Sequence, residues 1–196
     1  MDTKKLTIIC VAYERVVPLR ILIDCFVVQT NKNWMLYIVY DGPAPKKIKK
    51  VMGLYNDDRI MLVESEERNQ HYGHPNRKWM LERLPSCKDF LLMTNDDNYY
   101  VPRFVELMLA ECKEDVGLVY CDTTHSHAAY ATNFSELKEN YIDMGAFIVR
   151  QDVAKETGFN YICFNADGKY AVECAAACKK KNLKTVYINK SLFIHN

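Results

Sequence analysis

The chain has 196 residues, a length that suits one sizeable domain. Its 26 Lys and Arg residues nearly balance 25 Asp and Glu residues, and the formal net charge of +1 argues against a nucleic-acid-binding protein. Hydrophobic residues make up 49% of the chain, which argues against intrinsic disorder. No apolar run reaches the ~20 residues that span a bilayer, and residues 1–5 lack a signal-peptide pattern, so we expect a cytoplasmic protein.

The first half of the chain alternates between strand-like and helix-like segments. Buried strands are predicted at 6–11, 34–39, 59–63, 90–94 and 117–121. Helices are predicted near Pro18, over 48–55, from Pro75 and from Pro102, because proline favours a first helical turn and apolar residues recur on one face. This alternation predicts an α/β fold with a mostly parallel central sheet flanked by helices on both faces.

The second half is less regular. Residues 122–140 are polar and are predicted to form a mobile loop, and residues 141–149 are expected to be extended. A short helix over 151–157 should end at Gly158, a favourable residue for a helix C-terminus. A helix over 168–181 and a strand over 184–188 follow. No repeat or linker interrupts the chain, so a single domain over 1–196 is the economical interpretation.

Eight cysteines lie mostly within apolar segments, and none forms a C-x-x-C pair. Cys174 and Cys178 are four residues apart on a predicted helix, so they share a face that a metal ion could use. The alternative is that all eight are small buried hydrophobic residues in a reducing cytoplasm, and we favour this alternative.

The most informative segment is Asn95-Asp96-Asp97-Asn98, which directly follows the buried strand at 90–94. Ligands of open α/β sheets bind at the carboxyl ends of the strands. Paired carboxylates at that position suit a hard divalent cation, which can in turn hold a diphosphate. The alternative is a capped turn before the helix at Pro102. We favour the cation site.

The order of several short motifs resembles that of the family 2 type of nucleotide-sugar glycosyltransferases, which have the GT-A fold. These motifs are Ala12-Tyr13-Glu14, Gln29-Thr30, Tyr40-Asp41-Gly42-Pro43, Asn95-Asp96-Asp97-Asn98 and Asp167. They resemble, in turn, the opening turn, the Gln-Thr pair, Asp-Asp-Gly-Ser, the metal-binding Asp-x-Asp and the Glu-Asp of that family. The chain departs from the family pattern at Tyr40, Pro43, Asn95 and Ala166.

The resemblance implies a nucleotide-binding half over 1–121. In it, Ala12, Tyr13 and Glu14 border the nucleotide, and Asp41 accepts a hydrogen bond from the imide N–H of a uracil-like base. The alternative for Asp41 is a turn-forming role before Gly42. His74 and Arg77 fall at a predicted helix N-terminus, which is an anion site, so the resemblance implies that Arg77 meets the diphosphate and that His74 lines the pocket.

The resemblance also implies a metal site. Asp97 would coordinate Mn²⁺ or Mg²⁺, and Asp96 would bind the ribose or support the metal. His195 near the chain end would supply an imidazole ligand. His71, His125 and His127 are instead predicted to be loop residues, and His125-x-His127 alone is not a metal site.

The half over 122–196 would hold the acceptor and the catalytic base. Asp167 is implied to take the proton from the acceptor hydroxyl during an inverting transfer. The alternative for Asp167 is an N-cap of the helix that follows, and Asp143 is the reserve candidate for the base.

Taken together, these features predict an inverting, metal-dependent glycosyltransferase that uses a nucleotide-diphospho sugar, a UDP-sugar in the first instance. The expected acceptor is a glycan or glycolipid of surface polysaccharide synthesis. Because the chain stops at Asn196, the acceptor site is expected to be small or completed by a partner protein, with the protein placed peripherally at the inner face of the membrane. Two alternatives stay open: a nucleotidyltransferase, and a catalytically inactive relative that binds nucleotide-sugars.

Overall fold

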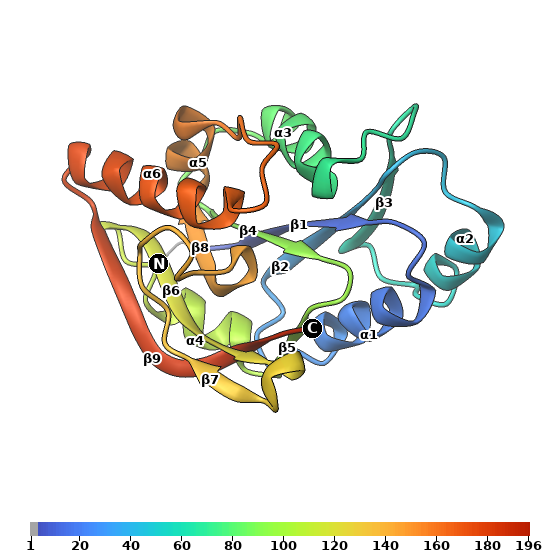
Figure 1. The fold of residues 1–196 in the computed structure, drawn as a ribbon, viewed down its shortest axis with the longest axis horizontal. Helices are drawn as coiled ribbons and strands as arrows, with labels where there is room; N and C mark the ends of the chain where they lie inside the picture. Colours follow the sequence, from blue (N-terminus) through green and yellow to red (C-terminus); the bar gives the residue numbers. More distant parts are fainter. Residues whose placement is uncertain (1–3) are drawn as a thin grey trace.

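Residues 4–196 are described by a computed structural model, in which helices cover both faces of one nine-stranded sheet (Figure 1). The strands are β1 (Leu6–Ala12), β2 (Trp34–Tyr40), β3 (Ile60–Glu64), β4 (Phe90–Asn95), β5 (Tyr99–Tyr100), β6 (Val116–His125), β7 (Ala131–Asn133), β8 (Phe147–Arg150) and β9 (Lys184–His195). The helices are α1 (Val16–Val27), α2 (Lys46–Met52), α3 (His74–Arg83), α4 (Phe104–Ala110), α5 (Gln151–Thr157) and α6 (Ala166–Lys180). Short 3₁₀ turns lie at η1 (His71–Gly73), η2 (Ser126–Ala128) and η3 (Met144–Ala146). The predicted α/β class with helices on both faces is confirmed.

The sheet runs in the order β3-β2-β1-β4-β8-β6-β9-β5, and β7 pairs with β6. Strands β3, β2, β1 and β4 are parallel neighbours. Strand β8 is antiparallel to both β4 and β6, and β9 is parallel to β6. It follows that β6 and β9 point in the same direction as the first four strands, so the carboxyl ends of six strands face one edge of the sheet.

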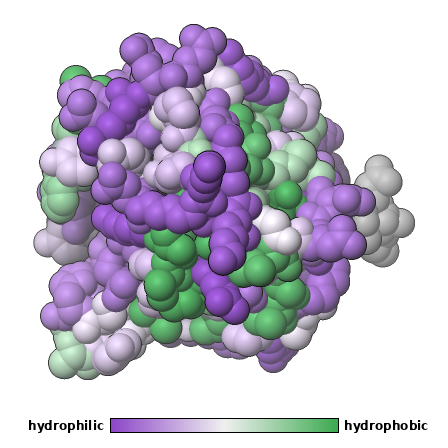
Figure 2. All heavy atoms as spheres, turned by 90° about the vertical axis from the view of Figure 1, so that its right-hand side faces the viewer, coloured by the Kyte–Doolittle hydropathy of each residue, from purple (hydrophilic) through white to green (hydrophobic). Residues whose placement is uncertain are grey.

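The helices form two layers. In Figure 1, α3, α5 and α6 cover one face of the sheet, and α1, α2 and α4 lie on the other. All seven residues of β1 are buried, as expected for a central strand covered on both faces. Helix α1 buries Leu19, Leu22, Ile23 and Phe26, which follow the helical spacing of three and four residues. The end of the molecule that carries α2 is mainly hydrophilic, with separate apolar areas (Figure 2).

The prediction of a loop over 122–140 was wrong for residues 122–133, whereas residues 134–140 form no helix or strand. Strand β6 continues to His125, and β7 at Ala131–Asn133 folds back to pair with it. Buried Asp122 explains why a polar segment can do this: it accepts hydrogen bonds from the Tyr187 hydroxyl and the Ser135 N–H. Because these hydrogen bonds replace those to water, the free-energy cost of burying the Asp122 side chain is reduced.

The other differences also concern the second half. Of the predicted extended segment 141–149, only residues 147–149 are in a strand, β8, and the predicted strand at 184–188 continues to His195 as the long strand β9. Helix α6 begins at Ala166, two residues earlier than predicted. Helix α5 ends at Thr157 before Gly158, as predicted.

Within the described residues, no disulfide is present, and no helix is long and apolar enough to cross a membrane. Cys174 and Cys178 are fully buried in the core, which fits small hydrophobic residues rather than metal ligands. The expectation about a signal peptide depends partly on residues 1–3, which lie outside the described residues.

Candidate functional site

The candidate site lies where the parallel strands end. In the sheet register, Ala12 is paired with Tyr40, and Val11 with Asn95. The residues that follow these strand ends are therefore neighbours, and they include Asp41 and Asp96. This is the edge at which open α/β sheets bind ligands.

A cleft of about 650 Å³ opens at this edge. It is lined by most of the residues that the sequence predicted for the nucleotide and the metal, namely Ala12, Tyr13, Glu14, Asp41, Asp96, Asp97 and His195. The sequence did not single out three other residues that line it, Arg15, Arg68 and Gln70. The structure thus brings together residues from the ends of four strands, although they lie up to 183 positions apart in the chain.

Asp96 and Asp97 lie in the turn between β4 and β5 and face this cleft. Asp96 is buried and accepts a hydrogen bond from the Tyr13 N–H at 3.1 Å. Burial disfavours its charged form and raises its pKa to about 6, an effect that the Tyr13 N–H and Arg15 partly offset. Asp97 forms an ion pair with Arg15. The alternative that these residues cap the helix after Pro102 is wrong, because α4 begins at Phe104 after Arg103.

Asp41 anchors a loop that is distant in sequence. Its Oδ1 accepts hydrogen bonds from the Asn69 N–H at 2.7 Å and the Asn76 side chain at 2.9 Å. Its Oδ2 accepts one from the Gln70 N–H at 3.0 Å. These bonds are long-range, so Asp41 does more than form a local turn before Gly42, the alternative considered from the sequence.

The loop that Asp41 holds is conformationally strained. Gln70, His71 and Tyr72 have φ values of 58°, 49° and 58°, and Gly73 has a φ of 73°. Residues other than glycine rarely adopt such angles, and each costs on the order of 1 kcal/mol or more. A Cβ atom at Gly73 would lie 2.8 Å from the side chain of Val11, so glycine is also required there for space. The strained segment lines the cleft, where hydrogen bonds from its surroundings maintain it.

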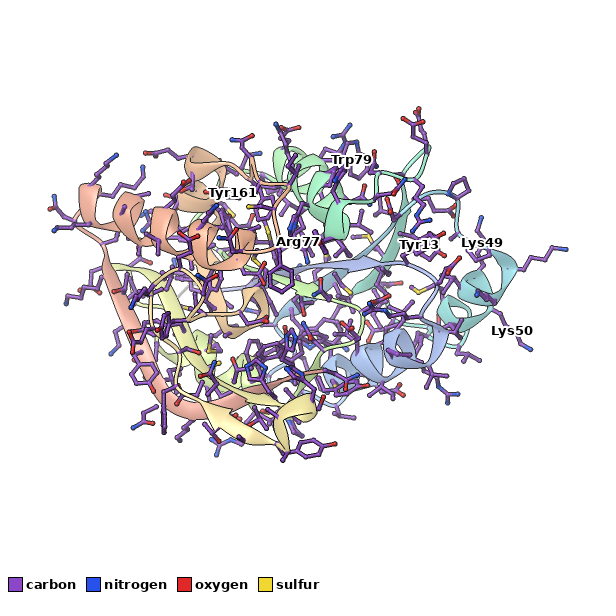
Figure 3. The ribbon with its side chains drawn as sticks, viewed as in Figure 1. Tyr13, Lys49, Lys50, Arg77, Trp79 and Tyr161 are labelled. Carbon is purple, nitrogen blue, oxygen red and sulfur yellow. The ribbon has the colours of Figure 1, made fainter. Side chains whose placement is uncertain are left out.

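Arg77 is buried and does not line this cleft. Its guanidinium donates to the Tyr72 carbonyl at 2.8 Å and to Asn95, and it contacts His74 Nδ1 at 3.0 Å. Figure 3 shows Arg77 in the interior beneath α3, whereas Tyr13 lies further toward α2. The structure therefore places Arg77 between the strained loop and β4, where it supports the strand end that carries Asn95.

His74 is also engaged within the protein. Its Nε2 lies 3.1 Å from the Cys163 carbonyl, and its Nδ1 faces Arg77. Burial and the nearby Arg77 charge lower its pKa to about 4, so the imidazole is neutral at physiological pH. In this state Nε2–H donates to Cys163 and Nδ1 accepts from Arg77.

A second pocket of about 380 Å³ adjoins the cleft and shares Tyr72, Asn95 and His195 with it. Asp167 lines this pocket and accepts a hydrogen bond from the Met144 N–H at 3.2 Å. Burial, reinforced by the charge of Asp143, raises the pKa of Asp167 to about 6. The N-cap alternative is wrong, because α6 begins at Ala166 with Asn165 at its N-cap and Asp167 lies inside the first turn.

Asp143, the reserve candidate for the catalytic base, lies in the same pocket and contacts His195. One of its oxygens accepts from the Gly145 N–H at 2.9 Å, and the other lies 2.7 Å from His195 Nδ1. This contact raises the pKa of His195. Asp143 therefore orients the histidine that stands between the two pockets.

The expectation that His125 is a loop residue was wrong, and the pair His125-x-His127, which alone is not a metal site, is joined by a third histidine. His125 ends β6, where it is paired in register with His195 of β9, and His127 lies in η2 directly after it. The three imidazoles have potential ligand atoms within 4.8 Å of one another. Sequence reasoning missed this cluster because it placed 122–140 in a loop and therefore did not pair β6 with the end of β9.

This architecture, one mixed sheet between two layers of helices, is GT-A-like. Crystal structures of S. aureus TarS share it: the chain matches TarS with a TM-score of 0.74 at 12% identity, over 98% of this chain and 36% of TarS. It matches TarS 1-349 in complex with UDP-GlcNAc with a TM-score of 0.76 at 14% identity, over 97% of this chain and 58% of that one. The mannosyltransferase PcManGT from Pyrobaculum calidifontis, in complex with GDP-Man and Mn²⁺, gives a TM-score of 0.68 at 13% identity. The match covers 97% of this chain and 56% of the mannosyltransferase.

These similarities establish the fold. The chain spans between about a third and three-fifths of the length of these structures. No family model matches the sequence. No curated protein matches it either.

Proposed function

We propose that this protein is an inverting glycosyltransferase that transfers a sugar from a UDP-sugar to a hydroxyl group of a glycan or glycolipid. The observation that carries the proposal is the convergence of Asp41, Asp96 and Asp97 on one cleft, beside a second pocket that contains Asp167. A cleft of about 650 Å³ suits a nucleotide-sized ligand. The similar structures solved with UDP-GlcNAc and with GDP-Man and Mn²⁺ support this class of donor.

The nucleotide base has a suitable surface at Tyr13. The Arg68 guanidinium lies 3.8 Å from the centre of the Tyr13 ring, so an aromatic face and a cation line this part of the cleft together. Asp41 Oδ2 accepts one hydrogen bond and retains capacity for another. It would accept from the imide N–H of uracil, a donor that cytosine lacks.

The diphosphate would lie at Asp96 and Asp97. The two carboxylates, which Arg15 contacts, form an oxygen donor set that suits Mn²⁺ or Mg²⁺. When bound, such an ion offsets the charge that develops on the departing nucleotide. Asp97 would coordinate the ion, and Asp96 would support the metal site. His195, which lines the same cleft, is the other predicted ligand.

The acceptor would enter the second pocket. Asp167 lies there with a pKa of about 6, so it is ionised at neutral pH and is a stronger base than an ordinary aspartate. It would take the proton of the attacking hydroxyl. Attack from this pocket, with the nucleotide leaving into the cleft, inverts the anomeric carbon. We also propose that the acceptor belongs to surface polysaccharide synthesis and that the protein binds peripherally at the inner face of the membrane.

Calorimetric titration of UDP with and without Mn²⁺ tests the donor site. We expect UDP to bind in the presence of Mn²⁺, and we expect Asp41→Asn to weaken UDP more than CDP. Absence of UDP binding at millimolar concentration would overturn the proposal.

Slow release of UDP from a UDP-sugar then tests the chemistry, and we expect Asp167→Asn to abolish this release. UDP-sugar binding without any turnover would support the alternative of a catalytically inactive relative. Pyrophosphate release from UTP and a sugar phosphate would instead support a nucleotidyltransferase.

A further inference from the structure

We propose that His125, His127 and His195 form a binding site for a Zn²⁺-type transition-metal ion, separate from the acidic pair Asp96–Asp97. The inference goes beyond the proposed function: it replaces the predicted role of His195 as a ligand of the ion at Asp97 and leaves the roles of Asp41, Asp96, Asp97 and Asp167 unchanged. It is based on the geometry of the three imidazoles, on the carboxylate that orients one of them, and on their position in the second pocket.

The backbone brings the three histidines together. His125 and His195 are paired residues on the neighbouring strands β6 and β9. His127 is presented by the tight connection between β6 and β7, in which Ala129 and Tyr130 adopt left-handed φ values of 53° and 57°. The cluster is thus fixed by strand pairing on two sides and by a short turn on the third.

The side-chain distances suit one ion. The imidazole centres lie 5.1 Å apart for His125–His127 and His125–His195, and 5.5 Å apart for His127–His195. One ligand atom of each residue lies within 4.8 Å of the others. A tetrahedral Zn²⁺ with bonds of about 2.0–2.1 Å holds its nitrogens about 3.4 Å apart. Side-chain rotations that bring the nitrogens closer by at most about 1.5 Å would therefore complete the site.

The partners of the imidazoles agree with this assignment. Asp143 Oδ2 lies 2.7 Å from His195 Nδ1, which leaves Nε2 of His195 for the ion. A carboxylate behind a histidine is the common supporting arrangement in zinc sites. Among residues 4–196, the imidazoles of His125 and His127 make ring contacts but no hydrogen bond, so their nitrogens are available.

The chemistry of the donor set selects the metal. Three imidazoles suit zinc and its late transition-metal neighbours, whereas the oxygen ligands of Asp96 and Asp97 suit Mg²⁺ or Mn²⁺. A site with three protein ligands has a fourth position for water or a substrate oxygen. All three histidines line the pocket that contains Asp167, so that position is accessible to an acceptor molecule. In this arrangement His195 is a ligand of the zinc ion, and oxygen atoms complete the coordination of the other ion at Asp97.

Zinc titration of the full chain, after treatment with a chelator and in competition with a chromophoric chelator, tests the site. We expect one tight Zn²⁺ per chain, and we expect His127→Ala to lower the affinity at least tenfold. Asp143→Asn should lower it about 10- to 100-fold, as loss of a supporting carboxylate does in known sites. Co²⁺ should give the intense visible absorption of tetrahedral coordination in the wild type but not in His127→Ala.

The controls separate the two ion sites. His71→Ala removes a histidine outside the cluster and should leave the zinc affinity unchanged, and Asp97→Asn should do the same. Unchanged zinc binding in a His125→Ala/His127→Ala double variant would overturn the proposal, as would loss of zinc binding in Asp97→Asn. Because His127 is exposed, its variant should unfold at the wild-type temperature when chelator is present. UDP titration with Mn²⁺ reports on the proposed function independently.

Discussion

Arg15 forms an ion pair with Asp97, and its guanidinium also lies 3.6 Å from Asp96. The Arg15 side chain is half exposed at 53%, whereas that of Asp96 is 6% exposed. The guanidinium therefore occupies the place at which a divalent cation would meet the two carboxylates. Arg15 and the proposed ion are competitors, and the half-exposed Arg15 side chain, at the N-cap of α1, can swing out toward solvent more readily than either aspartate can move.

The first prediction concerns this competition. Arg15→Ala should raise the affinity of the nucleotide-free protein for Mn²⁺ by up to about fivefold, because a partly exposed ion pair contributes about 0.2–1 kcal/mol. Calorimetric titration with Mn²⁺ measures this. Arg20→Ala is the matched control, since Arg20 lies on α1 and its ion pair with Asp24 is at the surface, away from Asp96 and Asp97. A fall in Mn²⁺ affinity in Arg15→Ala would contradict the competition and would indicate that Arg15 supports the ion.

A second prediction separates the metal from the nucleotide. Asp97→Asn should remove the enhancement of UDP binding by Mn²⁺, a loss of at least about tenfold or roughly 1.4 kcal/mol, while binding of UDP without metal changes little. The exposed Asp58→Asn serves as a control of the same charge change. If Mn²⁺ still strengthened UDP binding to Asp97→Asn, the ion would have to be held elsewhere.

The sequence predicted much of the first half of the molecule for a simple reason. The strands at 6–11, 34–39 and 90–94 are short apolar runs, and each is followed by polar residues at the sheet edge where ligands bind. Their parallel alignment follows from the alternation with helices. The shared location of Asp41, Asp96 and Asp97 was therefore predictable, as was the α/β architecture.

The second half was less predictable because its contacts are non-local. The end of β9 pairs with β5 and β6, so the position of His195 depends on strands that begin about 95 and 80 residues earlier. Arg15 and Arg68 were missed because each meets its carboxylate partner only after the strands have aligned. Arg77 at a helix N-terminus resembles an anion site in sequence; its guanidinium contacts Tyr72, His74 and Asn95, and Arg77 lines the second pocket rather than the cleft. No local pattern distinguishes these outcomes.

The third prediction is a pH dependence of transfer. Asp167 must be a carboxylate to take a proton, and its pKa is about 6, so the rate should rise with pH through about 6 and then level off. Asp143→Asn removes a neighbouring negative charge that raises this pKa, so the rising part of the profile should shift to lower pH. Release of UDP in the presence of an acceptor, measured from pH 5 to 8, gives the profile. Glu136→Gln, an exposed change in the second half of the chain, should leave it in place.

The raised pKa of Asp167 leads to a fourth prediction, that the carboxylate form needed for activity makes the fold less stable. The folded-state pKa of Asp167 is about 6, above its ordinary value of 3.8, so the fold binds this proton more tightly than the unfolded chain does. The stabilisation is fully present below about pH 4 and is lost as pH rises through about 6. Asp167→Asn, which stays neutral and can still accept from the Met144 N–H, should be more stable than the wild type at pH 8 by at most about 3 kcal/mol. Urea unfolding at pH 4 and pH 8 measures this, and an equal difference at both values would exclude titration of Asp167 as its cause.

The last prediction concerns the strained loop. Asp41 accepts hydrogen bonds from Asn69, Gln70 and Asn76, and these bonds hold the left-handed segment that lines the cleft. Asp41→Ala removes all three acceptor contacts and leaves the buried Asn76 amide and two partly buried N–H groups without this partner, which should cost about 1–3 kcal/mol of unfolding free energy. Because the segment would lose its anchor while the sheet stays intact, proteolysis at 69–73 should accelerate more than global unfolding does. Asp57→Ala, which loses an ion pair and hydrogen bonds to Arg59 away from the cleft, is the comparison. Equal proteolysis at 69–73 in the two variants would mean that Asp41 does not hold the segment.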